Sequence, residues 1–175
     1  MPRKAAKSSA SKPKQSAGPK ATRPHAPGYG LSKDAKGLLS WDWAANHLAR
    51  ARNYFITTVT PEGAPHVMVV WGLWFDNAFV FSTGRRSRKG RNLANNPRCV
   101  ICPENAEEAV IVEGIADEIT DKPTLKKIYA AYNDKYSFDP GGMAEPFFRV
   151  RPRRVFGLIE KSFTTSATRW LFPTS

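Results

Sequence analysis

The stretch NYFITTVTPEGAPHVMVVWGLWFDNAFVFS, residues 53–82, decides the fold. It is rich in β-branched and aromatic residues, which favour strands, and it contains two turn signals, Pro61-Glu62-Gly63 and Asp76-Asn77. We therefore predict strands at 53–60, 66–75 and 78–82. Because two hairpins follow each other directly, this part of the chain is predicted to be an antiparallel meander.

The flanking sequence extends this all-antiparallel pattern. Ser40 precedes an apolar-periodic stretch and predicts a short helix over about 40–51. After the meander, one or two helical turns at 91–96 are expected to end before Pro97. Further elements are predicted in this order: a strand at 98–102, a strand at 109–119 with a bulge or bend at Gly114, a helix capped by Asp121, and final strands at 147–150 and 155–160. The class is mainly β, a small closed or nearly closed barrel of about six antiparallel strands with short flanking helices.

The charge is unevenly divided along the chain. The 175 residues carry a net charge of +12, but residues 1–28 hold seven Lys or Arg and no acid, which leaves only +5 for the rest. Residues 1–28 also lack aromatic and β-branched aliphatic residues, so we expect a disordered basic arm at 1–28 and one domain at 29–175. We interpret this arm as a solubilising tail. The alternative is nonspecific phosphate binding, and only through this arm would nucleic acid be a partner.

Composition excludes several classes of protein. Two cysteines cannot build a disulfide scaffold, and a hydrophobic fraction of 41% is enough for a core. No stretch approaches 18 consecutive apolar residues, so no transmembrane helix is expected, and we expect a cytoplasmic protein.

The segment FSTGRRSRKG, residues 81–90, carries the chemistry. Four cations and three hydroxyl residues lie between a predicted strand end and a predicted helix start. Guanidinium, ammonium and hydroxyl groups all donate to phosphate oxygens, and the first amides of a helix do so too. The segment therefore predicts an anion site, most simply for a phosphomonoester, although a solvated surface turn is the alternative. The candidate residues are Ser82, Thr83, Ser87, Arg88 and Lys89.

Two runs of sequence resemble a known family. The family is the pyridoxamine 5′-phosphate oxidase-like flavoproteins, the FMN-binding split barrels. Its phosphate-binding segment resembles residues 81–97, FSTGRRSRKGRNLANNP. Its strand pair resembles residues 60–81, TPEGAPHVMVVWGLWFDNAFVF. The resemblance covers about residues 36–172. It implies a split barrel in which Arg88 and Lys89 bind the FMN phosphate, supported by Ser82, Thr83 and Ser87. It also implies that one strand lies along the isoalloxazine ring and offers it backbone groups, and that strand comprises Val67, Met68, Val69, Val70 and Trp71.

The resemblance further implies a homodimer with flavin sites at the subunit interface. An Arg/Trp pair near the C-terminus often completes the site of the partner, and Arg169 and Trp170 are the candidates here. The alternative is a terminal strand with Trp170 packed in the core. Of Trp71 and Trp74, one is expected to cover the ring and the other to pack inside.

Departures from the family pattern refine the expected activity. True pyridoxamine phosphate oxidases have Arg and Lys where this chain has Val67 and Gly72, and their flavin-contacting Gln falls at Ala109. Pyridoxal phosphate synthesis is therefore not expected, and the sequence is more similar to small flavin or deazaflavin oxidoreductases. These transfer hydride between the cofactor and a small organic substrate, and they need no dedicated acid–base pair. FMN is the expected cofactor and F420 the alternative. A non-catalytic flavin- or haem-binding split barrel with a nucleic-acid-binding arm stays open.

Two other groups of residues are read as structural. Cys99 and Cys102 lie in a predicted strand, where residues three apart point to opposite faces, so we expect two separate thiols. The three histidines are scattered over tail, helix and strand, and no metal site is expected. No catalytic residue is assigned.

Overall fold

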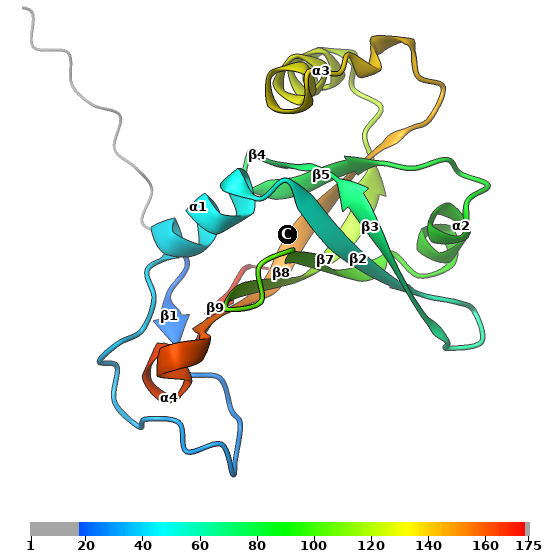
Figure 1. The fold of residues 1–175 in the computed structure, drawn as a ribbon. Coiled ribbons are helices and arrows are strands. Elements are labelled where there is room, and N and C mark those ends of the chain that lie inside the picture. Colours follow the sequence, from blue (N-terminus) through cyan, green and yellow to red (C-terminus); the bar gives the residue numbers. More distant parts are fainter. Residues whose placement is uncertain (1–17, 174–175) are drawn as a thin grey trace, which may run out of the picture.

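This computed structural model describes residues 18–173 of the chain, which form a barrel of antiparallel strands with four short helices (Figure 1). The strands are β1 Ala21–Thr22, β2 Asn53–Val59, β3 Pro65–Trp71, β4 Leu73–Phe75, β5 Ala78–Ser82, β6 Arg98–Pro103, β7 Glu108–Glu118, β8 Phe147–Ile159 and β9 Thr168–Leu171. The helices are α1 Trp41–Arg50, α2 Arg88–Asn95, α3 Lys122–Tyr136 and α4 Phe163–Ser166, with 3₁₀ turns at Pro140–Gly142 and Glu160–Ser162.

The sheet curls into a barrel that stays open along one seam. Its strand order is β1-β9-β8-β7-β6-β2-β3, and β5 pairs with both β4 and β8. Within the described residues β3 pairs only with β2, so the ladder is interrupted between β3 and β5. This is a split barrel, and its six longer strands match the expected number; β1, β4 and β9 are short.

Local signals in the sequence set most helix ends. Ser40 caps α1 by accepting a hydrogen bond from the Trp43 amide at 3.1 Å, and Asp121 caps α3 in the same way, with Pro123 in its first turn. The helix expected at 91–96 begins three residues earlier, at Arg88, because Ser87 is its N-cap and accepts from the Gly90 amide at 3.0 Å.

Two strand predictions were wrong. The strand expected at 66–75 is divided at Gly72, where an added Cβ would lie 2.2 Å from the Phe79 ring. The strands expected at 147–150 and 155–160 are one strand, β8. Pro152 is tolerated within it because it lies opposite Gly114, where the register shifts and β8 has one extra residue, Arg153. The irregularity predicted at Gly114 is therefore present, but the bulged strand is β8.

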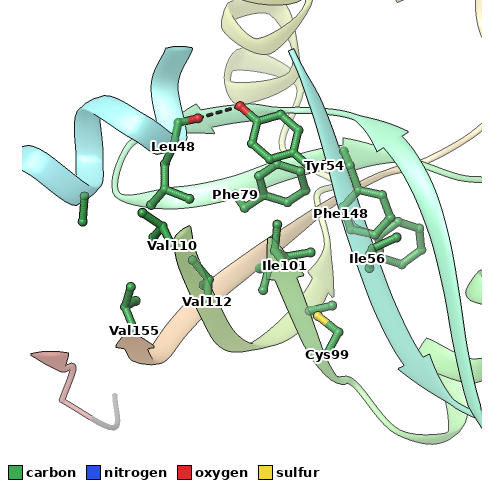
Figure 2. Packing of buried hydrophobic residues seen from close by; sticks show 14 of the residues in the cluster. Leu48, Tyr54, Ile56, Phe79, Cys99, Ile101, Val110, Val112, Phe148 and Val155 are labelled. Atoms are coloured by element: carbon green, nitrogen blue, oxygen red, sulfur yellow. Dashed lines mark hydrogen bonds between the residues drawn. The ribbon is translucent and has the colours of Figure 1, made fainter. Parts of the chain in front are cut away.

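The barrel interior is closely packed with aliphatic and aromatic side chains (Figure 2). Tyr54 is fully buried, and its hydroxyl donates to the Leu48 carbonyl at 2.5 Å, which ties α1 to β2. A second cluster lies under α3, where Ile128, Tyr132 and Tyr136 are buried. These residues follow one another at intervals of four positions, so they form one face of α3, and that face is the packed one.

The N-terminal residues differ from the expectation of a disordered arm. Residues 1–17 lie outside the described residues, but residues 18–28 lie against the C-terminal part of the barrel. β1 pairs with β9, and the Arg23 guanidinium donates to the carbonyls of Thr165 (2.5 Å), Ala167 (2.9 Å) and Lys36 (2.7 Å). Backbone pairing and one arginine fork therefore order a segment that has little apolar surface of its own. Among residues 18–173, no helix is both long and apolar enough to cross a membrane.

The helices lie at different ends and sides of the barrel. In Figure 1, α3 lies at one end while α4 and β1 lie at the other, and α1 and α2 lie on opposite sides. The seam between β3 and β5 is bordered by the start of α2, and the candidate site is found there.

Candidate functional site

The loop between β5 and α2 is held in one shape by its own hydroxyl groups. The Thr83 and Ser87 hydroxyl oxygens are 3.0 Å apart, and the Ser87 amide donates to the Gly84 carbonyl at 3.0 Å. An added Cβ at Gly90 would lie 2.4 Å from that same carbonyl oxygen, so the helix can start this close to the loop only with glycine there. Thr83 and Ser87 therefore support the loop.

The cations of this loop have different surroundings. Arg85 is paired with Glu118 at 2.5 Å and is exposed. Arg88 is exposed at the first turn of α2. Lys89 is half-buried, and desolvation lowers the pKa of its ammonium group; it forms no salt bridge to any residue from 18 to 173. A desolvated cation without an acidic partner is well suited to bind an anionic ligand.

A cavity of about 380 Å³ joins Lys89 to the predicted ring-binding strand. Five of its lining residues were predicted from the sequence: Val69, Val70, Trp71, Ser82 and Lys89. Four were not: Tyr132, Phe138, Met143 and Phe147. The structure thus brings the strand and the cationic loop to one cavity, as the resemblance implied.

The remaining predicted residues lie around this cavity without lining it. Val67 and Met68 are on β3 and are 54% and 47% exposed. Thr83, Ser87 and Arg88 belong to the loop and the start of α2. The Ser82 hydroxyl donates to the Pro146 carbonyl at 3.0 Å and so connects the loop to the segment that leads into β8.

Helix α3 fixes the strand end at the cavity. The Tyr132 hydroxyl donates to the Trp71 carbonyl at 2.8 Å, and the Tyr136 hydroxyl accepts from the Gly72 amide at 2.9 Å. The indole of Trp71 stacks on the Tyr136 ring, with centroids 4.6 Å apart and planes 8° apart. Trp74 packs inward against Trp41, at 6.0 Å between centroids. Of the two tryptophans, Trp71 is the one at the cavity.

The C-terminal candidates lie in β9 and do not line the cavity of their own chain. Trp170 is fully buried in the core and packs edge-on against Trp41 at 5.6 Å, so the core alternative is correct for this residue. The Arg169 guanidinium donates to the Thr22 hydroxyl at 3.2 Å. Because β9 pairs with β8 and also with β1, this segment is an inner strand of the sheet, and Trp170 is not available to another chain's cofactor.

A larger cavity lies elsewhere. It measures about 480 Å³, lies over β2, β6 and β7, and contains Arg98, Glu113 and Arg153. None of the sequence-predicted residues lines it. We place the candidate site at the smaller cavity because only there do an unpaired cation, a hydroxyl group and an edge strand meet.

The cysteines are not paired with each other in the described structure. Cys99 is buried and Cys102 is half-buried on opposite faces of β6, and both are free thiols. Burial raises the pKa of both. The described part of the chain contains no group of three or more His, Cys, Asp or Glu placed to hold a metal ion.

Comparison with known proteins shows the family of the chain. The sequence profile described as pyridoxamine 5′-phosphate oxidase matches residues 42–159. A pyridoxine/pyridoxamine 5′-phosphate oxidase of Anaeromyxobacter dehalogenans is 34% identical over 101 residues, which is 56% of this chain and 41% of that enzyme. The alignments span only 32% to 41% of the length of the curated relatives.

Solved structures show the same fold. A conserved hypothetical protein of Mycobacterium tuberculosis is 21% identical with a TM-score of 0.63, covering 71% of this chain and 88% of that one. A protein described as F420 reductase is 26% identical with a TM-score of 0.52, covering 63% of this chain and 93% of that one. With the profile matching most of the barrel and the fold agreeing, the chain belongs to the pyridoxamine 5′-phosphate oxidase family.

Proposed function

We propose that the protein is a flavin-dependent oxidoreductase that binds FMN at the cavity between β3 and α2 and transfers hydride to or from a small organic substrate. One observation carries the proposal. Lys89, a half-buried cation without an acidic partner among the described residues, opens into the same cavity as Val69, Val70 and Trp71. A phosphate would neutralise this cation, and a planar ring would cover the edge strand.

The chain's own residues would bind and orient the cofactor. The Lys89 ammonium and the nearby Arg88 guanidinium would hold the phosphate, and the first amides of α2 would face it. β3 is an edge strand, so part of its backbone is left unpaired by β2 and is free to hydrogen-bond a ring. Bound flavin supplies the hydride chemistry, and the protein positions a substrate against the ring.

F420 is the second candidate cofactor. It also carries a phosphate and a flavin-like ring, which the same loop and strand would suit. The likeness to the F420 reductase, at 26% identity, supports this alternative.

We also propose that two copies of the chain form the working unit. On one face of β3, Val67 and Val69 are 54% and 52% exposed, and Phe55 of β2, which lies opposite Val69, is 43% exposed. A contiguous apolar patch of this kind on an edge strand usually marks an interface. A second copy would cover the patch and also close one side of the cavity, since Val69 belongs to both.

The test is the cofactor that copurifies with the protein. We expect flavin absorbance at about 450 nm, with the mass of FMN in the released cofactor. Arg88→Ala with Lys89→Ala should abolish retention while the chain stays folded. Arg86→Ala is the matched control, because this residue lies in the same loop, is exposed and does not line the cavity.

Each outcome bears on one part of the proposal. A protein that retains neither FMN nor F420 overturns the enzyme assignment. Full retention by the double variant overturns the phosphate site. A monomer of the flavin-loaded protein in sedimentation experiments overturns the proposed pair.

A further inference from the structure

We infer that the substrate end of this cavity accepts an uncharged, planar, apolar molecule that stacks beside Trp71. The inference rests on the proposed function in one respect, because it assigns the Lys89 end of the cavity to the cofactor phosphate. It goes further by naming the class of substrate and the residues that select it.

The cavity has one polar end and one aromatic end. Ser82 and Lys89 come from β5 and α2, and Phe147 of β8 lies opposite Ser82 in the strand pair. Trp71, Phe138 and Met143 come from β3 and from the connection after α3, and they form the aromatic end. Tyr132 is the only other polar residue in the lining. Its hydroxyl is used by the Trp71 carbonyl at 2.8 Å, and desolvation raises its pKa, so it stays neutral.

Once the cofactor phosphate is bound, no charge in the lining is left for the substrate. Lys89 is the only charged residue among the described residues that line the cavity. A substrate phosphate or carboxylate placed among Trp71, Phe138 and Met143 would lose its hydration without gaining a partner from these side chains, and this weakens its binding. An uncharged substrate avoids it.

The aromatic end is also incompletely covered. Trp71, Phe138 and Met143 are 40%, 42% and 37% exposed, although all three border the same cavity. The rings of Trp71 and Phe138 are 6.3 Å apart at 68°, an edge-to-face arrangement. A flat apolar molecule would cover this surface and find a ring face or edge on more than one side.

Trp71 is held firmly enough to act as a stacking surface. Its carbonyl is bound by Tyr132, the next amide is bound by Tyr136, and one face of its indole rests on the Tyr136 ring. Little conformational entropy is then lost when a ligand contacts the indole. Phe138 and Met143 lie on either side of the short turn Pro140–Gly142 and complete the end of the cavity.

One cation lies close enough to support a different reading. The Arg52 guanidinium is 5.7 Å from the Trp71 ring centroid and 5.6 Å from that of Tyr136, although Arg52 does not line the cavity. An anionic substrate would need this residue, whereas a neutral one would not. Arg52→Ala therefore separates the two classes.

The experiment compares two ligands that differ only in charge. FMN-loaded protein is titrated with 2-naphthol and with 2-naphthyl phosphate, and flavin occupancy is read from its absorbance in the same samples. We expect 2-naphthol to bind at least about tenfold more tightly. In samples matched for flavin occupancy, Phe138→Ala with Met143→Ala should weaken 2-naphthol binding by about tenfold or more, whereas Trp71→Phe should preserve most of the 2-naphthol affinity. Arg52→Ala should leave it unchanged.

The outcomes distinguish this inference from the proposed function. Failure to load FMN overturns both, and it is seen before any ligand is added. Normal loading with tighter binding of 2-naphthyl phosphate, lost in Arg52→Ala, overturns the uncharged class alone. Normal loading with 2-naphthol affinity unaffected by the Phe138/Met143 double variant overturns the assignment of the aromatic end.

Discussion

The Lys135 ammonium donates a hydrogen bond to the Gly72 carbonyl at 3.0 Å, at the point where β3 ends and β4 begins. The same ammonium donates to the Tyr54 hydroxyl at 2.8 Å and to the Ala49 carbonyl at 3.3 Å. One side chain of α3 thus joins α1, β2 and the break in the strand that leads to the cavity. All three of its protons are used, and it forms no salt bridge with the described residues.

The surroundings of Lys135 predict a pH dependence of stability. Desolvation lowers the pKa of this lysine to about 8, and the Arg52 charge lowers it while Glu104 raises it. Between pH 8 and its ordinary value of 10.5, the unfolded chain binds more protons at this residue than the folded chain does. The free energy of unfolding should therefore rise with pH across this window.

Lys135→Met removes that contribution. We expect the wild-type protein to gain stability relative to Lys135→Met as the pH rises from 8 to 10.5, measured by urea denaturation at each pH. Lys126→Met on the same helix is the control, because Lys126 is exposed and should show no such trend. A wild-type curve parallel to that of Lys135→Met would contradict the lowered pKa.

We predict that removal of the Ser87 hydroxyl lowers both the stability of the protein and its affinity for the cofactor. Ser87→Ala removes the N-cap of α2 and the contact with Thr83, which should cost about 1 kcal/mol of unfolding free energy. FMN affinity should fall with it because the phosphate loop loses its support. Ser40→Ala removes the equivalent cap of α1, far from the cavity. It should lower stability by a similar amount while FMN titration gives an unchanged affinity.

We predict that a side chain at Gly90 disturbs the same loop more severely and abolishes FMN retention. In Gly90→Ala the new methyl group would lie 2.4 Å from the Gly84 carbonyl oxygen and 2.8 Å from that of Arg85, so the loop backbone must move. We expect FMN retention to be lost with the far-UV circular dichroism of the barrel preserved. Gly142→Ala, where nothing lies within 4 Å, is the control and should behave like the wild type. Equal flavin retention in both variants would show that the loop does not position the phosphate.

These features show which parts of the molecule follow from local sequence. Helix caps at Ser40 and Asp121, the irregularity at Gly114 and the cationic loop depend on residues within a few positions of one another, and the structure contains them all. The capping of α2 by Ser87 is also a local signal, a serine three residues before the Gly90 amide it binds, and the helix start at Arg88 could have been found from it.

The parts that were not predicted depend on residues far apart in sequence. The order of residues 21–23 follows from pairing with β9, about 150 positions away, and from the hydrogen bonds of Arg23. The break at Gly72 is the exception, since it follows from the packing of Phe79 seven positions later. Phe138 and Met143 reach the cavity only because the connection between α3 and β8 folds back toward β3. Distant pairing of this kind leaves no periodic trace in the sequence.

We predict that substitution of Trp170 lowers the stability of the protein without lowering its affinity for the cofactor. Trp170→Ala should lower the free energy of unfolding by about 3–5 kcal/mol, because it leaves a large cavity in the barrel core. Trp170→Phe should cost less, since the indole nitrogen it removes is buried without a hydrogen-bond partner. FMN affinity of the folded Trp170→Phe variant should equal that of the wild type. A weakened affinity would restore this residue to the site.

The two thiols are expected to react at different rates and not with each other. Cys99 is buried and faces the barrel core, where desolvation raises its pKa to about 12. Cys102 is only half-buried on the other side of β6, and burial raises its pKa too. Only the thiolate reacts with a disulfide reagent, so at pH 8 Cys102 should be labelled at least about tenfold faster than Cys99 in the folded protein. Cys102→Ser should leave one slow thiol, and denaturant should make both react at once.

Because the side chains point to opposite faces of one strand, mild oxidation should give no internal disulfide. A rapid disulfide between the two cysteines would mean that β6 is not a regular strand in solution.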